Sequence, residues 1–132
     1  MLFHATGVYE QGVSDPDPET APQNVLVNHI LMPKRDAPRN PTTLYLALLG
    51  TGGETVTLDL HLLIESGRPD AKRADYINAD ARWFKFATSE VVTNGTLAKV
   101  TSGIPAGGII YARRTSDTIT AGQTRSLVMA WQ

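Results

Sequence analysis

Apolar and polar residues alternate with a period of two through the middle of the chain. Every second position from Val56 to Ile64 is aliphatic, whereas the intervening positions include Thr55, Thr57, Asp59 and His61. This period is typical of a β-strand with one buried face and is not that of a helix. An apolar run at residues 42–49 precedes it, and the glycine-rich link at 50–53 tolerates the positive φ of a tight turn. We therefore predict a β-hairpin over residues 42–65.

The remaining chain contains further short β-prone runs separated by turn residues. Asn94-Gly95 stands between two such runs, which is a strong hairpin signal. Leu127, Met129 and Trp131 share one face of the last run. The other predicted strands cover residues 24–32, 82–87, 91–93, 96–100, 109–114, 117–120 and 125–131. About eight short antiparallel strands with one long connection at 66–81 favour an all-β sandwich, with a jelly roll first and an immunoglobulin-like sandwich second.

The first residues differ in composition from the rest. Pro16, Pro18 and Pro22 interrupt an acidic stretch, and proline removes the amide proton that a strand or helix would use. We predict an extended arm over residues 1–23, followed by the sandwich domain over 24–132. Leu2, Phe3, Val8, Tyr9 and Val13 offer anchors for one short strand in the arm, and the arm either packs on another surface, such as a neighbouring subunit of an oligomer, or stays mobile.

Composition removes several classes of function. The 132 residues fit one domain, and the absence of cysteine excludes disulfides, thiolate metal sites and cysteine nucleophiles. The net charge of −1 lacks the basic excess of a nucleic-acid-binding protein. No apolar stretch reaches the ~18 residues of a membrane span, and the first residues do not resemble a signal peptide. We expect neither nucleic acid nor membrane as a partner, and assembly in a cytoplasm.

No catalytic constellation is visible. His4, His29 and His61 have no second histidine at ligand spacing, so a cupin-like metal enzyme is a third hypothesis only. The acidic residues Asp15, Asp17 and Glu19 lack the glycine turn of a calcium loop, and we expect a solvated acidic arm. We predict no catalytic residue, no metal and no cofactor.

Aromatic residues provide an alternative to a purely structural role. Trp83 and Tyr76, together with Tyr45 and Tyr111, would form a sugar-stacking platform if they were exposed. Strand aromatics more often pack in cores or interfaces. Asn94-Gly95-Thr96 matches a glycosylation sequon, but its turn role accounts for it.

The C-terminal third of the chain resembles a known group of proteins. Residues 92–97, Val-Thr-Asn-Gly-Thr-Leu, precede a segment at 102–116 that contains Ile104-Pro105-Ala106-Gly107 between two strands. Over residues 91–131 this pattern resembles small β-sandwich virion proteins of tailed bacteriophages, of the head decoration (cement) or neck and tail accessory type. The resemblance implies a structural role and a homo-oligomer, often a trimer, on a capsid lattice.

We therefore expect a non-enzymatic capsid decoration protein that binds itself and the major capsid or connector protein within the virion. The alternative is a carbohydrate-binding module or fibre head that recognises a cell-surface glycan through Trp83 and Tyr76. The candidate partner-contact residues lie in the arm and in the basic loops: Tyr9, Asp15, Asp17, Lys34, Arg35, Arg39, Arg68, Lys72 and Arg73.

Overall fold

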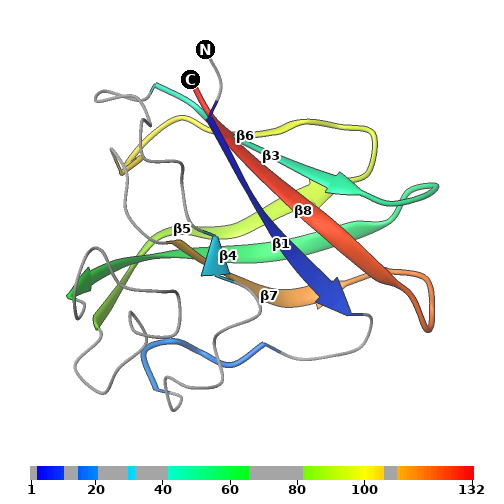
Figure 1. Ribbon diagram of the computed structural model, residues 1–132, viewed down its shortest axis with the longest axis horizontal. Coiled ribbons are helices and arrows are strands. Elements are labelled where there is room, and N and C mark those ends of the chain that lie inside the picture. Colours follow the sequence, from blue (N-terminus) through cyan, green and yellow to red (C-terminus); the bar gives the residue numbers. More distant parts are fainter. Residues whose placement is uncertain (1–2, 11–14, 21–29, 32–41, 66–81, 106–109) are drawn as a thin grey trace.

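The alternation of apolar and polar residues along the chain corresponds to an all-β structure. The computed structural model describes residues 3–10, 15–20, 30–31, 42–65, 82–105 and 110–132 (Figure 1). The strands within this part of the chain are β1 (Phe3–Glu10), β2 (Ile30–Leu31), β3 (Leu44–Leu49), β4 (Thr55–Glu65), β5 (Arg82–Thr93), β6 (Ala98–Val100), β7 (Ile110–Asp117) and β8 (Thr124–Trp131). None of these described segments is a helix long and apolar enough to cross a membrane.

The strands form two antiparallel sheets that face one another. Sheet A has the order β1-β8-β3-β6, and sheet B has the order β2-β7-β4-β5. The packed sheets are consistent with the predicted β-sandwich (Figure 1). Consecutive strands often lie in different sheets, so the chain repeatedly crosses from one layer to the other.

Residues 3–10 of the predicted N-terminal arm form a strand of the sandwich. This segment is β1, and it pairs with β8 along its full length, from Phe3 opposite Trp131 to Glu10 opposite Thr124. An edge strand forms backbone hydrogen bonds to a neighbouring strand on one side only. A segment with few apolar residues can therefore still join a sheet through its backbone. The sandwich therefore includes the start of the chain.

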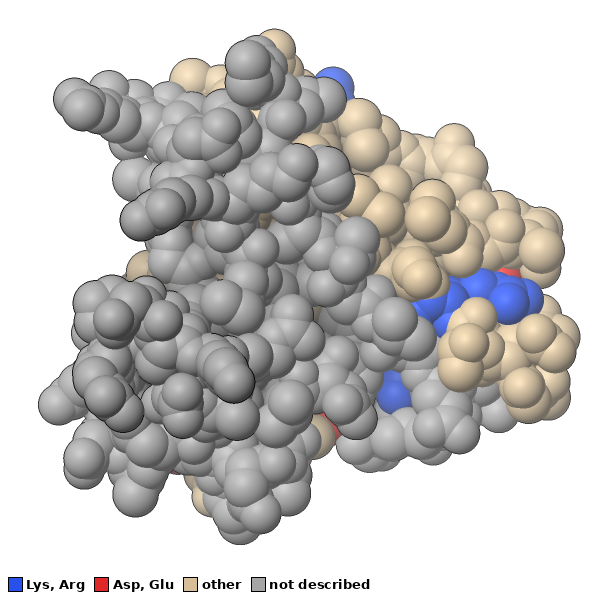
Figure 2. All heavy atoms as spheres, in the orientation of Figure 1, with Lys and Arg blue, Asp and Glu red and all other residues tan. Residues whose placement is uncertain are grey.

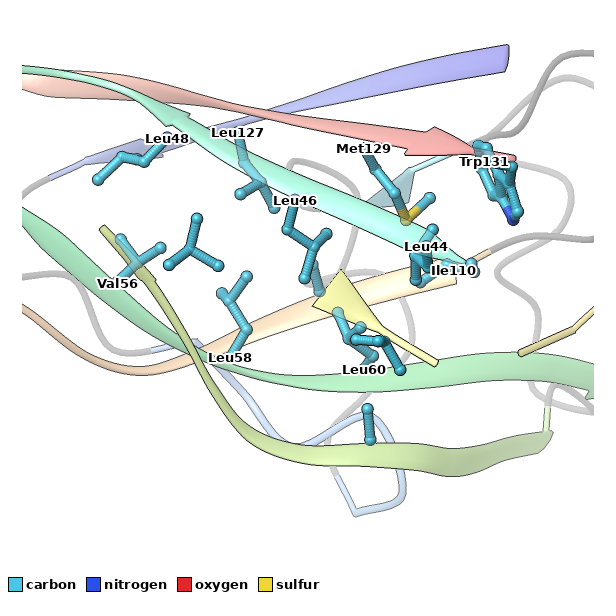
Figure 3. Close-up of a cluster of buried hydrophobic side chains, with 14 of the residues drawn as sticks. Leu44, Leu46, Leu48, Val56, Leu58, Leu60, Ile110, Leu127, Met129 and Trp131 are labelled. Carbon is cyan, nitrogen blue, oxygen red and sulfur yellow. The ribbon is translucent and has the colours of Figure 1, made fainter. Parts of the chain in front are cut away.

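The core lies between the sheets and follows the predicted alternation. Val56, Leu58 and Leu60 of β4 are fully buried, as are Met129 and Trp131 of β8. Figure 3 shows the side chains of β3 and β8 pointing from sheet A toward those of β4. Burial of each such side chain contributes about 1.5–3 kcal/mol relative to exposure. The period of two thus identified the core face of β4 and of β8 correctly.

Both predicted hairpins are wrong, because each turn joins strands of different sheets. The turn at 50–54 leads from β3 in sheet A to β4 in sheet B, and the Asn94-Gly95 turn leads from β5 in sheet B to β6 in sheet A. Gly52 and Gly95 do adopt positive φ, at 53° and 84°. Turn residues fix a reversal of direction, but they do not decide whether the next strand pairs with the last one or packs across the core from it.

The strand β5 merges two predicted strands, at 82–87 and 91–93, into one irregular strand. Its register against β4 shifts at three places, one of them between Leu58 and Leu60. Ser89 lies at this shift with a φ of 54°, and its backbone N–H donates to the Asp59 carboxylate over 2.9 Å. A β-bulge of this kind adds twist to a strand. The predicted long connection at 66–81 and most of the predicted strand at 24–32 lie outside the described residues.

Candidate functional site

Segment 15–20 packs on the outer face of sheet B. His61 is opposite Tyr111 and Asp59 is opposite Arg113, so these four side chains share the face turned away from the core. The Tyr111 hydroxyl donates to the Pro16 carbonyl over 2.9 Å, and Arg113 Nε donates to the Asp15 carbonyl over 3.4 Å. The segment therefore covers this face beside β7.

Asp15 is buried in an ion pair, which contradicts the expected solvated acidic arm. The Asp15 side chain is 0% exposed and that of Arg114 is 1% exposed. The Arg114 backbone N–H donates to Asp15 Oδ2 over 2.7 Å, and Arg114 Nη2 lies 3.6 Å from Asp15 Oδ1. Arg114 Nη1 also lies 3.2 Å from Asp117 Oδ2. Paired charges of this kind tolerate burial, whereas one partner alone would not.

His61 is buried beneath the same segment as a neutral ring. Its side chain is fully buried, and neither ring nitrogen has a hydrogen-bond partner among the described residues. Glu19 Oε1 lies 4.0 Å from Nδ1, and the Tyr111 ring centroid lies 6.2 Å from that of His61. Burial lowers the pKa of His61, and this effect outweighs the opposing charges of Asp17 and Glu19. Among the described residues, no three potential metal ligands converge at this or any other point.

Asp59 is an ionised carboxylate that holds the sheet together. Burial acts to raise its pKa, but the hydrogen bond from Ser89 and the nearby Lys85 lower it below its ordinary value. Lys85 Nζ lies 3.4 Å from Asp59 Oδ2, and Arg113 Nη1 lies 3.9 Å from the same oxygen. A carboxylate held in this way is poorly suited to act as a general acid near neutral pH.

A second polar cluster ties two turns and strand β8 together at one end of the sandwich. The buried Glu54 carboxylate accepts hydrogen bonds from Thr51 N (2.6 Å), Thr120 N (2.6 Å), Thr120 Oγ1 (2.7 Å) and Arg125 Nε (2.8 Å). The hydrogen bond from Arg125, then those from Thr120 and Thr51, hold the pKa of Glu54 far below its ordinary value. Glu54 therefore links the β3–β4 turn, the β7–β8 turn and β8.

Asn94 adds the β5–β6 turn to this cluster. Its Oδ1 accepts from the Gly50 N–H over 3.2 Å, its Nδ2 donates to the Gly52 carbonyl over 2.9 Å, and its backbone N–H donates to the Glu54 carbonyl over 2.8 Å. Both ends of the amide thus bind a neighbouring turn. The structure supports a turn role for Asn94, which sequence reasoning assigned, although the turn connects two sheets.

The predicted glycan platform does not form at Trp83. Trp83 is 7% exposed, Tyr111 is 0% exposed, and their ring centroids lie 6.0 Å apart. Tyr45 is half-buried, and its hydroxyl donates to Gln132 Oε1 over 2.9 Å. Tyr76 lies outside the described residues. The burial of Trp83 and Tyr111 on the covered face of sheet B matches the usual role of strand aromatics and not the exposed platform of the alternative hypothesis.

The predicted partner-contact residues separate into three groups. Asp15 is buried against Arg114, whereas the Asp17 carboxylate is partly exposed and lies 3.9 Å from Arg113 Nη1. Tyr9 lies in β1 at the register position opposite Arg125. The basic residues lie outside the described residues: Lys34, Arg35, Arg39, Arg68, Lys72 and Arg73.

The long-range pairs were the features that sequence reasoning missed. Asp15 and Arg114 are 99 residues apart, and Glu54 and Arg125 are 71 apart, so no local spacing could have indicated either contact. Both clusters hold backbone and side chains in place.

Comparison with protein-family models, with curated proteins and with solved structures finds no match for this chain.

Proposed function

We propose that this chain is a non-enzymatic structural protein of a virion, a capsid decoration protein that binds the outer capsid or connector lattice as a homo-oligomer. It would reach the virion by assembly in the host cytoplasm. Its partners would be other copies of itself and the major capsid or connector protein.

The observation that carries this proposal is the nested pairing of the strands. β1 pairs with β8, β2 with β7, β3 with β6, and β4 with β5. This is the pairing expected when one long hairpin is rolled into two facing sheets, so it supports a jelly roll within the sandwich. The jelly roll is an architecture of viral capsid and lectin domains.

The use of the buried charges also favours a structural role. Asp15 pairs with Arg114, Glu54 pairs with Arg125, and Asp59 binds the Ser89 N–H and lies beside Lys85. Each of these described charged side chains forms hydrogen bonds or ion pairs that hold parts of the fold together. A scaffold that presents surfaces to partners needs this kind of internal bonding more than it needs a poised acid or base.

The alternative, a glycan-binding module or fibre head, draws on the same architecture, since lectins also use jelly rolls. The burial of Trp83 against Tyr111 weighs against the aromatic platform that this alternative requires. We therefore rank it second.

Co-sedimentation of the purified protein with assembled capsid shells of the phage that encodes it tests the proposal. We expect saturable binding at a ratio that matches a symmetry site of the lattice, and no binding to unassembled capsid subunits. A protein that fails to bind shells, necks or tails, and that instead binds a glycan array, would overturn the proposal in favour of the alternative.

A further inference from the structure

Asn94 is the only asparagine in the chain that precedes a glycine. The backbone nitrogen of a following glycine can attack the asparagine side chain, because glycine has no Cβ to hinder the approach. A bond forms between Gly95 N and Asn94 Cγ, and the bond from Cγ to Nδ2 breaks. Nδ2 leaves as ammonia with the proton that Gly95 N has given up to water. A second water then opens the cyclic imide to aspartate or isoaspartate, which completes a deamidation.

Gly95, which supplies the attacking nitrogen, lies at the surface of the molecule. Beyond its chain neighbours, no atom lies within 4 Å of the position that a Cβ would occupy. The β3–β4, β5–β6 and β7–β8 turns lie at the same end of the sandwich, at the right of Figure 1. Figure 2 shows that described and mostly uncharged atoms form the outer surface of this end. Water and hydroxide therefore reach the Gly95 N–H, so burial of this group does not prevent the reaction.

The side chain of Asn94 is held by the neighbouring turn at 50–54. Its Oδ1 accepts from the Gly50 N–H over 3.2 Å, and its Nδ2 donates to the Gly52 carbonyl over 2.9 Å. Attack on Cγ makes this atom tetrahedral and moves Oδ1 and Nδ2 out of their common plane. The reaction therefore distorts or breaks both hydrogen bonds, and the closed turn opposes it.

The turn that holds Asn94 is itself fixed by the Glu54 carboxylate. Glu54 accepts from Thr51 N over 2.6 Å and from Arg125 Nε over 2.8 Å, and its backbone carbonyl accepts from Asn94 N over 2.8 Å. The Asn94 side chain is released only when these contacts loosen. Such a local opening needs less free energy than unfolding of the whole sandwich.

We propose that Asn94 is a deamidation site, which its bonds to turn 50–54 protect in the closed sandwich and which reacts when this end of the molecule opens. This inference rests on the chemistry of the turns and does not depend on the proposed function.

Deamidation also prevents the opened end from closing as before. Both products lose the Nδ2 donor and bring a carboxylate oxygen to the Gly52 carbonyl, where two acceptors face one another. Isoaspartate in addition passes the backbone through Cγ, which lengthens the turn. The reaction therefore turns a transient opening into a permanent loss of the contact between turns.

Peptide mapping by mass spectrometry measures the rate on the full chain. We expect Asn94 to deamidate at least about tenfold more slowly in the folded protein than in the same chain unfolded in guanidinium chloride, since two hydrogen bonds are lost on unfolding. The other asparagines of the unfolded chain serve as internal controls, because each precedes a residue with a side chain. Equal rates at Asn94 in the two states, or no reaction in the unfolded chain, would overturn the inference.

Glu54→Gln loosens the protecting turn without changing the reacting groups. We expect this variant, while still folded by circular dichroism, to deamidate at Asn94 several-fold faster than the wild type. Asp17→Asn is the matched control, because it removes one negative charge on segment 15–20 and its new amide precedes Pro18, which has no N–H to attack it. An unchanged rate in Glu54→Gln, or the same increase in Asp17→Asn, would show that the turn does not protect Asn94.

Asn94→Asp reproduces one of the products and tests its effect on the fold. We expect its thermal midpoint to lie about 3–5 °C below that of the wild type, because both bonds to the turn at 50–54 are altered. Thr96→Asp, which adds the same charge at an exposed position of the same turn, should melt close to the wild type. Equal midpoints for the two variants would contradict a permanent loss of the contact between turns.

Discussion

Neutralising Asp15 tests whether segment 15–20 is a built part of the sandwich. Asp15→Asn keeps an oxygen that can accept from the Arg114 N–H, now 2.7 Å from Oδ2, but it removes the negative charge beside a guanidinium that is 1% exposed. Asp17→Asn is the matched control, because Asp17 lies on the same segment but its side chain is 36% exposed and 3.9 Å from Arg113 Nη1.

The two changes should differ strongly in their cost. Removing one partner of a buried ion pair typically costs 3–5 kcal/mol, and Asp117, 3.2 Å from Arg114 Nη1, still neutralises part of the remaining charge. We therefore expect Asp15→Asn to lower the free energy of unfolding by about 2–3 kcal/mol. An exposed pair contributes about 0–1 kcal/mol, so Asp17→Asn should cost less than about 1 kcal/mol.

Urea unfolding followed by circular dichroism and by tryptophan fluorescence measures both values. For a protein of this size the expected loss in Asp15→Asn shifts the midpoint by about 1–2 M. Hydrogen exchange should also show faster exchange of the Arg114 amide in this variant only. Equal midpoint shifts for the two variants would refute the buried pair and, with it, the placement of segment 15–20 on sheet B.

Three further predictions concern the core and the two polar clusters. Leu46→Ala removes a side chain that is 0% exposed and should lower the free energy of unfolding by about 2–5 kcal/mol in urea melts, whereas Val91→Ala, 55% exposed, should change it by less than about 0.5 kcal/mol. Arg125 and the threonines lower the pKa of Glu54 from its ordinary value of 4.5, so in acid the unfolded state binds more protons than the folded state, and the free energy of unfolding should fall as pH drops below 4.5. Glu54→Gln should be less stable than the wild type at neutral pH and should show a smaller fall in acid. An unchanged acid profile in this variant would contradict the cluster. Burial likewise lowers the pKa of His61 below 6.5, so wild-type stability should decline as pH falls below 6.5, by at most ~1.4 kcal/mol per pH unit. His61→Phe should remove that slope without loss of stability at pH 8. A slope that persists unchanged in the variant would contradict a buried, neutral His61.

Local patterns predicted most of the strands and their core faces, because the periodicity of a strand is written in its own residues. The separate strand predicted at 117–120 was wrong, since β7 ends at Asp117 and residues 118–120 form no strand. The alternation from Val56 to Leu60 and the shared face of Leu127, Met129 and Trp131 both correspond to fully buried side chains. The glycines at 52 and 95 adopt the positive φ that turn chemistry indicated.

Pairing between distant strands could not be predicted in the same way. Asn94-Gly95 reverses the chain, but β5 pairs with β4 in sheet B and β6 pairs with β3 in sheet A, so this turn carries the chain across the core. The same limit applies to the charged residues: Asp15 looked solvated among prolines, and only the fold brings it to Arg114. Trp83 gave no sequence signal that separates a sugar platform from burial, and the fold places it beside Tyr111.

Cryo-electron microscopy of intact virions tests the central proposal most directly. The account predicts density for a two-sheet sandwich on the outer surface of the capsid or connector, at symmetry-related positions. Virions that lack this density on their surface, while the protein is present in the infected cell, would contradict it.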